Sequence, residues 1–342
     1  IYIHLIKEQI SKGKQVLYLL PEIALTSQII NRLRKFFGRQ IGVYHSRFND
    51  MERVEVWRRT EDLDSEHHFK VILGVRSSLF LPFKNLGLII VDEEHDSSYK
   101  QKDPAPRYNA RDSAIVLAGL HGAKVLLGSA TPSIDSVYNC STGKFGLVEL
   151  NSRHGDVRMP EIEIADTREA YRRKIMVSHF TPQLISETER TLKLSEQVVF
   201  FRNRRGYAPV IICNDCGWTP VCPDCSVNMT YHKGLDTLKC HYCGKNISNT
   251  GICASCGSHD LSMKGFGTEK IEDEISMLFP EANIGRMDLD TTRKKGAVER
   301  IISRLENGKI DILVGTQMIA KGLDFENLTL VGVLNVDNML FL

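Results

Sequence analysis

The stretch LIIVDEEHD, residues 88–96, decides both the fold and the place of the chemistry. Four apolar residues in a row, 88–91, are typical of a fully buried parallel strand. The run changes abruptly to acidic side chains at Asp92, and ligands bind at the carboxyl ends of strands in an open α/β sheet. An aspartate there can hold Mg²⁺ through water, and the adjacent Glu93 can orient the water that attacks a γ-phosphate. The plain alternative is a strand followed by an acidic turn.

Strands and helices alternate on both sides of this stretch. Apolar runs predict short buried strands, and amphipathic segments predict the helices between them. The predicted strands are 16–20, 41–45, 71–74, 88–91 and 125–127, and the predicted helices are 1–12, 27–37, 51–59 and 111–120. This alternation indicates a doubly wound parallel sheet.

Polar residues come directly after several of these strands. They are Glu22 and Thr26, His45 and Ser46, Arg76 and Ser77, Asp92 to His95, and Ser129 and Thr131. Since the strands are parallel, these residues are expected at one edge of the sheet. Any one of them alone is more often a helix cap or a turn residue, but their repetition favours a functional edge.

A basic loop with prolines, 100–111 (KQKDPAPRYNAR), follows the acidic stretch. With Tyr99, Arg107 and Tyr108 it offers rings and cations that can stack on bases and contact phosphates of a nucleic-acid strand. The alternative interpretation is a solvated connection between two elements.

Eight of the nine cysteines lie between residues 213 and 256. They form four Cys-x-x-Cys pairs, 213/216, 222/225, 240/243 and 253/256, and glycine follows three of the pairs. Such turns point backbone N–H groups at thiolates, so the pattern predicts two structural Cys₄ zinc sites. Redox dithiols, an iron–sulfur cluster and disulfides are the alternatives, and spacing alone does not say which pairs share a metal.

The α/β pattern appears again on both sides of the cysteines. Strands are predicted at 197–201, 283–287, 311–314 and 328–334. We therefore expect a first lobe at 1–150, a linker and the start of a second lobe at 151–208, a zinc-binding insertion at 209–262, and the remainder of the second lobe at 263–342.

Composition excludes some classes of protein. The hydrophobic content of 42% and charged content of 25% suit a globular chain of 342 residues. A net charge of +2 shows no global field for nucleic acid, so any such binding needs local patches. No apolar run approaches the roughly 18 residues of a membrane span, and no signal peptide is visible. The chain starts at Ile1 within a predicted helix and ends within an apolar run, so both ends are expected to be truncated.

Several motifs together resemble superfamily 2 helicases. LYLLPEIALTSQ resembles their motif Ia, VDEEH and GSATPS motifs II and III, and GTQMIAKGLDF motif V. FRNRRGY leading into paired Cys-x-x-Cys motifs is similar to the primosomal helicase family, PriA. The resemblance covers essentially the whole chain. It implies an α/β fold of two RecA-like P-loop NTPase helicase lobes, both incomplete here, with a small Cys-rich zinc-binding insertion in the second lobe.

The resemblance also implies an activity: ATP-dependent 3′–5′ unwinding of DNA at stalled forks, with primosome assembly for replication restart. Asp92 would hold Mg²⁺ with ATP, and Glu93 would activate water. His95, Ser129 and Thr131 would couple hydrolysis to DNA movement. Gly322 and Asp324 would lie near the nucleotide. The DNA-facing residues would be Arg76, Ser77, Tyr99, Arg107, Tyr108, Thr316, Gln317 and Lys321.

In this family the outer cysteine pairs share one zinc and the inner pairs share the other. The resemblance thus implies two structural Zn²⁺ ions, one bound by Cys213, Cys216, Cys253 and Cys256, and one by Cys222, Cys225, Cys240 and Cys243. It implies single-stranded and forked DNA, primosome proteins and single-strand-binding protein as partners, no membrane association, and a bacterial cytoplasmic location at the nucleoid.

Two departures limit what this stretch of sequence should do alone. No G-x-x-x-x-G-K-[ST] motif occurs in it, and the arginine-bearing motif VI is absent. Without these groups the β- and γ-phosphates lose their main ligands, and charge in the transition state is poorly neutralised. We therefore expect this chain alone to hydrolyse little or no ATP, although the intact protein should.

Two other functions remain open from the sequence. One is a non-catalytic, zinc-bearing DNA-binding scaffold that has lost its ATPase. The other is a different zinc-bearing translocase of the same superfamily, acting on RNA or on other DNA structures.

Overall fold

The structure is a computed structural model in which the chain divides into two compact units, 1–160 and 161–342. It describes residues 1–21, 27–45, 48–152, 159–202, 210–232, 235–264, 267–288, 290–292, 296–316, 319 and 323–336. Each unit is described by itself. The boundary at residue 160 lies ten residues beyond the first-lobe boundary predicted at residue 150.

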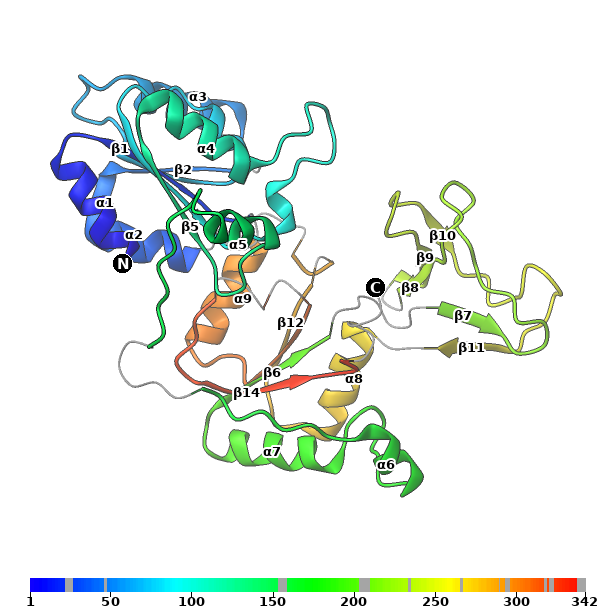
Figure 1. Cartoon of the computed structure of the whole chain (residues 1–342). Helices are drawn as coiled ribbons and strands as arrows, with labels where there is room; N and C mark the ends of the chain where they lie inside the picture. Colours follow the sequence, from blue (N-terminus) through cyan, green and yellow to red (C-terminus); the bar gives the residue numbers. More distant parts are fainter. Residues whose placement is uncertain are drawn as a thin grey trace. The chain divides into compact units, whose positions relative to one another are not determined.

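Unit 1 is a five-stranded parallel sheet in the order β2-β3-β1-β4-β5 (Figure 1). Its strands are β1 (Gln15–Leu19), β2 (Ile41–Tyr44), β3 (Val71–Gly74), β4 (Leu86–Asp92) and β5 (Lys124–Gly128). Its helices are α1 (Tyr2–Ser11), α2 (Ser27–Phe37), α3 (Asp50–Glu61), α4 (Ala110–His121) and α5 (Ile134–Ser141).

Alternate side chains of the strands build a core on each face of this sheet. Leu17, Ile89 and Val91 pack with α3 and α4, while Val16 and Ile90 pack with α1 and α2. The central strand β1 is buried along its whole length, which is why it reads as a continuous apolar run and not as an alternating one.

Unit 2 contains a four-stranded parallel sheet in the order β12-β13-β6-β14. Its strands are β6 (Gln197–Phe201), β12 (Ile284–Met287), β13 (Ile312–Gly315) and β14 (Leu328–Val333). Its helices are α6 (Thr167–Arg172), α7 (Pro182–Lys193), α8 (Thr268–Leu278) and α9 (Ala297–Glu306). Helices α7 and α8 pack on one face of the sheet, and α9 packs on the other.

The Cys-rich segment forms two small antiparallel sheets between β6 and α8 (Figure 1). One sheet pairs β7 (Val210–Cys213) with β11 (Leu261–Lys264). The other joins β8 (Thr230–His232), β9 (Thr237–Lys239) and β10 (Asn246–Ser248). Its core is small, with Met229, Tyr231 and Leu238 around buried cysteines, so its stability has to come from more than apolar burial.

The α/β class and the position of the insertion agree with the sequence prediction. The structure also extends the strand predicted at 88–91 to Leu86–Asp92, so that Asp92 itself lies in β4. Within the part of the chain that the structure describes, no helix has both the length and the apolar character to span a membrane.

Candidate active site and metal centres

The acidic end of β4 is held by tyrosines that come from other elements. Tyr2 of α1 donates to Asp92 Oδ1 at 2.9 Å, and Tyr18 of β1 donates to Asp92 Oδ2 at 3.0 Å. Tyr99 donates to the Asp92 carbonyl oxygen at 2.6 Å. Burial, followed by the nearby Asp92 charge, raises the pKa of all three phenols, so they stay protonated donors. No sequence pattern pointed to Tyr2 and Tyr18, because their partner Asp92 lies in a different element of the fold.

Glu93 lies directly after the strand in a left-handed backbone conformation, with φ of 51°. That conformation is uncommon for a residue with a side chain, and such residues concentrate at functional sites. Its carboxylate is half-buried and reaches within 3.6 Å of His95 Nδ1. The turn therefore places the Glu93 carboxylate beside His95.

His95 links the end of β4 to the end of β5. Its Nδ1 lies 2.8 Å from Ser129 Oγ, and its Nε2 lies 3.4 Å from Thr131 Oγ1. Ser129 Oγ also accepts from the Thr131 N–H at 2.9 Å. The structure thus brings together the three residues expected to couple the two motifs.

Glu94, unlike Glu93, is buried. It belongs to a hydrogen-bond network that the sequence did not reveal. It accepts from the Ser133 N–H at 2.6 Å, from the Ser133 and Ser136 hydroxyls at 3.0 Å each, and from Arg111 Nη1 at 3.1 Å. Burial opposes the charged form, but these donors outweigh it and lower the pKa of Glu94. An acidic residue next to a catalytic candidate therefore has a structural role.

Gly128, the last residue of β5, lies close to the acidic end of β4. A Cβ at this position would lie 1.9 Å from the Tyr2 hydroxyl and 3.4 Å from Asp92 Oδ1. Any side chain here would displace Tyr2 from Asp92, so the close approach of β5 to the acidic edge requires glycine.

The expected DNA-facing residues of unit 1 divide into two groups. Arg76, Ser77 and Tyr108 are half-buried and Arg107 is exposed, so each can reach a ligand. Arg76 donates to the carbonyl oxygens of Ser98 and Lys100 and so orders the start of the basic loop. Tyr99 differs from its prediction: it is 1% exposed, and its ring has no free face for a base. Aromatic character suggested stacking, but the ring belongs to the core.

In unit 2, several predicted residues lie outside the described part of the chain. These residues are Gln317, Lys321 and Gly322. In unit 1 the same holds for Glu22, Thr26 and Ser46. Thr316 directly follows β13 and is 5% exposed, so it is not on the surface as a DNA-facing residue would be. Asp324 is exposed.

The eight paired cysteines gather into two groups of four. Cys213, Cys216, Cys253 and Cys256 form one group, and Cys222, Cys225, Cys240 and Cys243 form the other. These are the outer and inner sets that the family resemblance implied. The sulfur atoms of each group lie within 4.8 Å of one another, from segments that are far apart in sequence.

The four pairs share one local geometry. The residue after each second cysteine has a positive φ: Gly217, Gly244, Gly257 and, in the fourth turn, Ser226. Each donates its N–H to the carbonyl oxygen of the first cysteine of its pair at 2.9 Å. N–H groups of Cys243 and Tyr242 point at the Cys240 sulfur and lower its pKa to about 7. The turn thus favours a thiolate at Cys240, whereas the hydrogen bond with the Cys243 sulfur raises the pKa of Cys225 to about 12.

The sulfur separations fit a tetrahedral zinc ion. Cys213 and Cys256 sulfurs are 3.6 Å apart, those of Cys216 and Cys253 3.5 Å, and those of Cys222 and Cys243 3.7 Å. Four thiolates bound to Zn²⁺ at about 2.3 Å lie about 3.8 Å from one another. A disulfide needs sulfurs about 2.05 Å apart, and all nine cysteines are free. The geometry therefore favours metal binding over disulfides.

Known families match three parts of the chain. Residues 1–140 match the DEAD/DEAH box helicase family, residues 222–247 the PriA DNA helicase Cys-rich region domain, and residues 266–340 the helicase conserved C-terminal domain. The first match covers the five strands of unit 1, the second covers the inner cysteine group, and the third covers β12, β13 and β14 of the second sheet.

Curated proteins that resemble the chain are named replication restart protein PriA. The chain is 44% identical to the one from Bacillus subtilis (strain 168) over 340 residues, which cover 99% of the chain and 42% of the relative. It is 42% identical to that of Haemophilus influenzae, covering 100% and 46%. It is 44% identical to that of Rickettsia conorii, covering 98% and 51%. The chain therefore spans about half the length of these relatives.

A solved structure with a similar fold is RecG bound to a three-way DNA junction. The TM-score is 0.51 with 12% sequence identity, over 96% of this chain and 33% of that one. At this identity the likeness concerns the fold alone, and it agrees with two helicase-type α/β units.

Proposed function

The chain belongs to the PriA family of DNA helicases, and from this premise we propose that the intact protein is an ATP-driven 3′–5′ DNA helicase that restarts replication at stalled forks. Unwinding there would be followed by primosome assembly. The curated relatives carry the name of replication restart proteins, and the family matches cover both α/β units.

One observation carries the proposal: Asp92 and Glu93 stand at the carboxyl end of β4, and His95 connects Glu93 to Ser129 and Thr131 directly after β5. Asp92 has about four acceptor positions on its carboxylate, and Tyr2, Tyr18 and the Glu93 N–H occupy three. The remaining position suits a water of hydrated Mg²⁺, which would neutralise charge on the phosphates of ATP.

Glu93 is assigned as the residue that orients and deprotonates the attacking water. It is half-buried, next to His95, and not engaged in the network that holds Glu94. The Glu93 carboxylate lies 3.6 Å from the His95 imidazole, which in turn contacts Ser129 and Thr131. A movement of Glu93 during hydrolysis would therefore be passed to these two residues through His95. These contacts support His95, Ser129 and Thr131 as the coupling residues.

The DNA face of unit 1 is assigned to Arg76, Ser77, Arg107 and Tyr108. Tyr108 packs edge-on against exposed Phe80, with ring centroids 5.1 Å apart, which leaves an aromatic pair at the surface of the loop. Gln317 and Lys321 are proposed for DNA in unit 2, and Gly322 and Asp324 for the nucleotide. Tyr99 and Thr316 are buried, so they are not assigned to the DNA face.

The two Cys₄ groups are assigned to structural Zn²⁺. Four sulfur ligands leave no open position for a water or a substrate, which is the arrangement of a structural site. The proposed partners are single-stranded and forked DNA, the other primosome proteins and single-strand-binding protein. With DNA as its substrate, the intact protein is proposed to act in the bacterial cytoplasm at the nucleoid.

The test is ATP hydrolysis by the intact protein, measured with and without single-stranded DNA. Glu93→Gln keeps the shape of the side chain and removes the base, so turnover should fall by roughly 10²- to 10⁴-fold. Glu66→Gln, an exposed residue of unit 1, is the matched control and should hydrolyse ATP at the normal rate. A folded, zinc-loaded protein with no hydrolysis at all would instead indicate a non-catalytic DNA-binding scaffold.

A further inference from the structure

The strand β2 forms one edge of the sheet in unit 1. It pairs with β3 along Ile41–Tyr44, and no strand lies on its other side within the described residues. In such an edge strand, alternate N–H and C=O groups point away from the sheet. An extended peptide can bond to these groups and add itself to the sheet.

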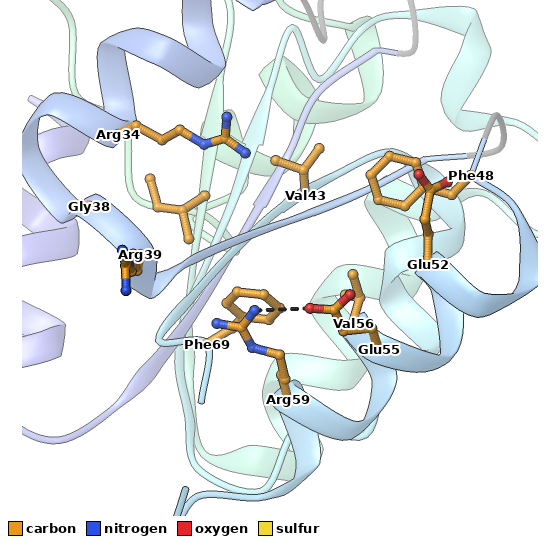
Figure 2. Close-up of a pocket in the computed structure, with 11 residues that line it drawn as sticks. Arg34, Gly38, Arg39, Val43, Phe48, Glu52, Glu55, Val56, Arg59 and Phe69 are labelled. Atoms are coloured by element: carbon orange, nitrogen blue, oxygen red, sulfur yellow. Dashed lines mark hydrogen bonds and ion pairs between the residues drawn. The ribbon is translucent and has the colours of Figure 1, made fainter. Parts of the chain in front are cut away.

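A groove of about 600 Å³ surrounds this free edge (Figure 2). Its lining comes from both faces of the sheet. Arg34 lies in the last turn of α2, and Arg39 follows the helix. Both are on the face of the sheet to which Ile41 and Val43 belong. Val56 and Phe69 belong to the apolar core of the opposite face. The groove is thus cationic on one side of the strand edge. Its other side combines apolar Val56 and Phe69 with the charged residues of α3 that line the groove.

The charged residues that line the groove differ in whether they are already paired. Arg59 lies 3.1 Å from Glu55, donates to the His67 carbonyl oxygen and stacks on Phe69 with its guanidinium 3.9 Å from the ring centre. Glu52 closes the capping box of α3. For Arg34 and Arg39, both exposed, the described residues provide no hydrogen bond or ion pair. The groove therefore has two arginines that are not paired within the described residues, and its lining has a net charge of +1.

We propose that this groove binds an extended, acidic and apolar peptide segment of a partner protein, which adds as a strand to the free edge of β2. Side chains of a strand alternate between the two faces of its sheet. Acidic residues at every second position would face Arg34 and Arg39, and the apolar residues between them would face Val56 and Phe69. Four residues of β2 offer about 13 Å of edge, enough for a short linear segment.

Two other occupants fit the groove less well. A second copy of the chain would bring two cationic grooves together, which opposes edge-to-edge pairing. A nucleic-acid strand would satisfy the arginines but not the backbone groups of β2. The groove is also separate from the ATPase candidate: Arg39 precedes β2 and lies at its amino end, whereas Asp92 lies at the carboxyl end of parallel β4.

The test measures binding of a labelled eight-residue peptide of alternating Glu and Val, acetylated and amidated, to the intact protein without ATP or DNA. Arg34→Glu with Arg39→Glu should weaken binding about tenfold or more, because two ionic contacts become repulsive. Lys35→Glu with Lys102→Glu changes the net charge equally outside the groove and should leave binding unchanged. A peptide with Lys in place of Glu should not bind.

Two peptides with N-methyl groups on alternate amides test the strand pairing directly. Only one set of alternate amides of an edge-bound strand faces the sheet, so one methylated peptide should lose binding and the other should keep it. Equal effects of the two methylations, or full binding by the Arg34/Arg39 variant, would overturn the proposal.

Two further results would assign the edge to another occupant. If the protein dimerises and the Arg34/Arg39 variant does not, the edge pairs with a second copy of the chain. Binding of a single-stranded oligonucleotide with the same dependence would assign it to nucleic acid. Either of these two results would overturn the proposal that the groove binds a peptide.

Discussion

At the scale of single residues, the adjacent acids Glu93 and Glu94 have different tasks. Glu94 is 3% exposed and fully engaged by Ser133, Ser136 and Arg111. We expect Glu94→Ala to lower the free energy of unfolding of unit 1 by about 3 kcal/mol, because it leaves the Arg111 cation without its buried partner. Glu93→Ala should change stability little, since Glu93 is half-exposed. Denaturant unfolding, followed in both variants, checks the difference.

The contribution of Glu94 should also depend on pH. Its pKa in the folded state lies below the ordinary value of 4.5, because the hydrogen bonds favour the charged form. The stabilisation is therefore fully present above pH 4.5 and is lost as the pH falls through the folded-state pKa. The stability gap between the native chain and Glu94→Gln should be widest near neutral pH and close in acid. A gap that widened on acidification would contradict this assignment.

At the scale of elements, the connection between β4 and β5 is the junction at which we expect coupling. His95 is the side chain that joins Glu93 to Ser129 and Thr131. His95→Ala should retain basal ATP hydrolysis by the intact protein and lose roughly tenfold of its stimulation by single-stranded DNA, in the range of a typical coupling energy. His67→Ala, an exposed histidine of the same unit, is the control. Normal stimulation in His95→Ala would remove His95 from the coupling role.

The Cys-rich sheets depend on metal more than on apolar burial. Cys222 is 1% exposed and belongs both to the inner cysteine group and to the small core around Met229. Cys222→Ser should reduce bound zinc from two ions to one per chain and unfold the sheet of β8, β9 and β10. Cys140→Ser, the one cysteine outside the pairs, should keep both ions. Zinc content by atomic emission decides, and two ions in Cys222→Ser would refute the two-site assignment.

The sequence predicted these elements well where local pattern determines them. Apolar runs identified β1, β3 and β4, and the cysteine spacing identified the four Cys-x-x-Cys turns, since both signals depend on neighbours in the chain. Prediction from the sequence failed where tertiary contacts determine the role of a residue. Tyr99 looks like a stacking residue and is a core residue, and Tyr2 and Tyr18 meet Asp92 across the sheet. Glu94 is indistinguishable from Glu93 until Ser133 and Arg111 fold against it.

At the scale of the whole molecule, the chain consists of two units that each have a core on both faces of a parallel sheet. Each unit is therefore expected to resist unfolding by itself. The connection between them is different: residues 146–151 and 159–166 contain no helix or strand, and Leu147, Val148, Leu150, Ile162 and Ile164 are all at least 66% exposed.

Limited proteolysis should consequently divide this chain at that connection first. Thermolysin cleaves beside large apolar residues, and cleavage needs a locally extended backbone, which these segments offer without unfolding either sheet. We expect two resistant fragments of similar size, with the zinc remaining in the C-terminal one. Leu147→Asp, Val148→Asp and Leu150→Asp together should slow the first cut and direct it to residues 159–166. Early cuts within β1 to β5 or within β12 and β13 would show instead that the sheets are less stable than their connection, and that the two units do not fold as separate cores.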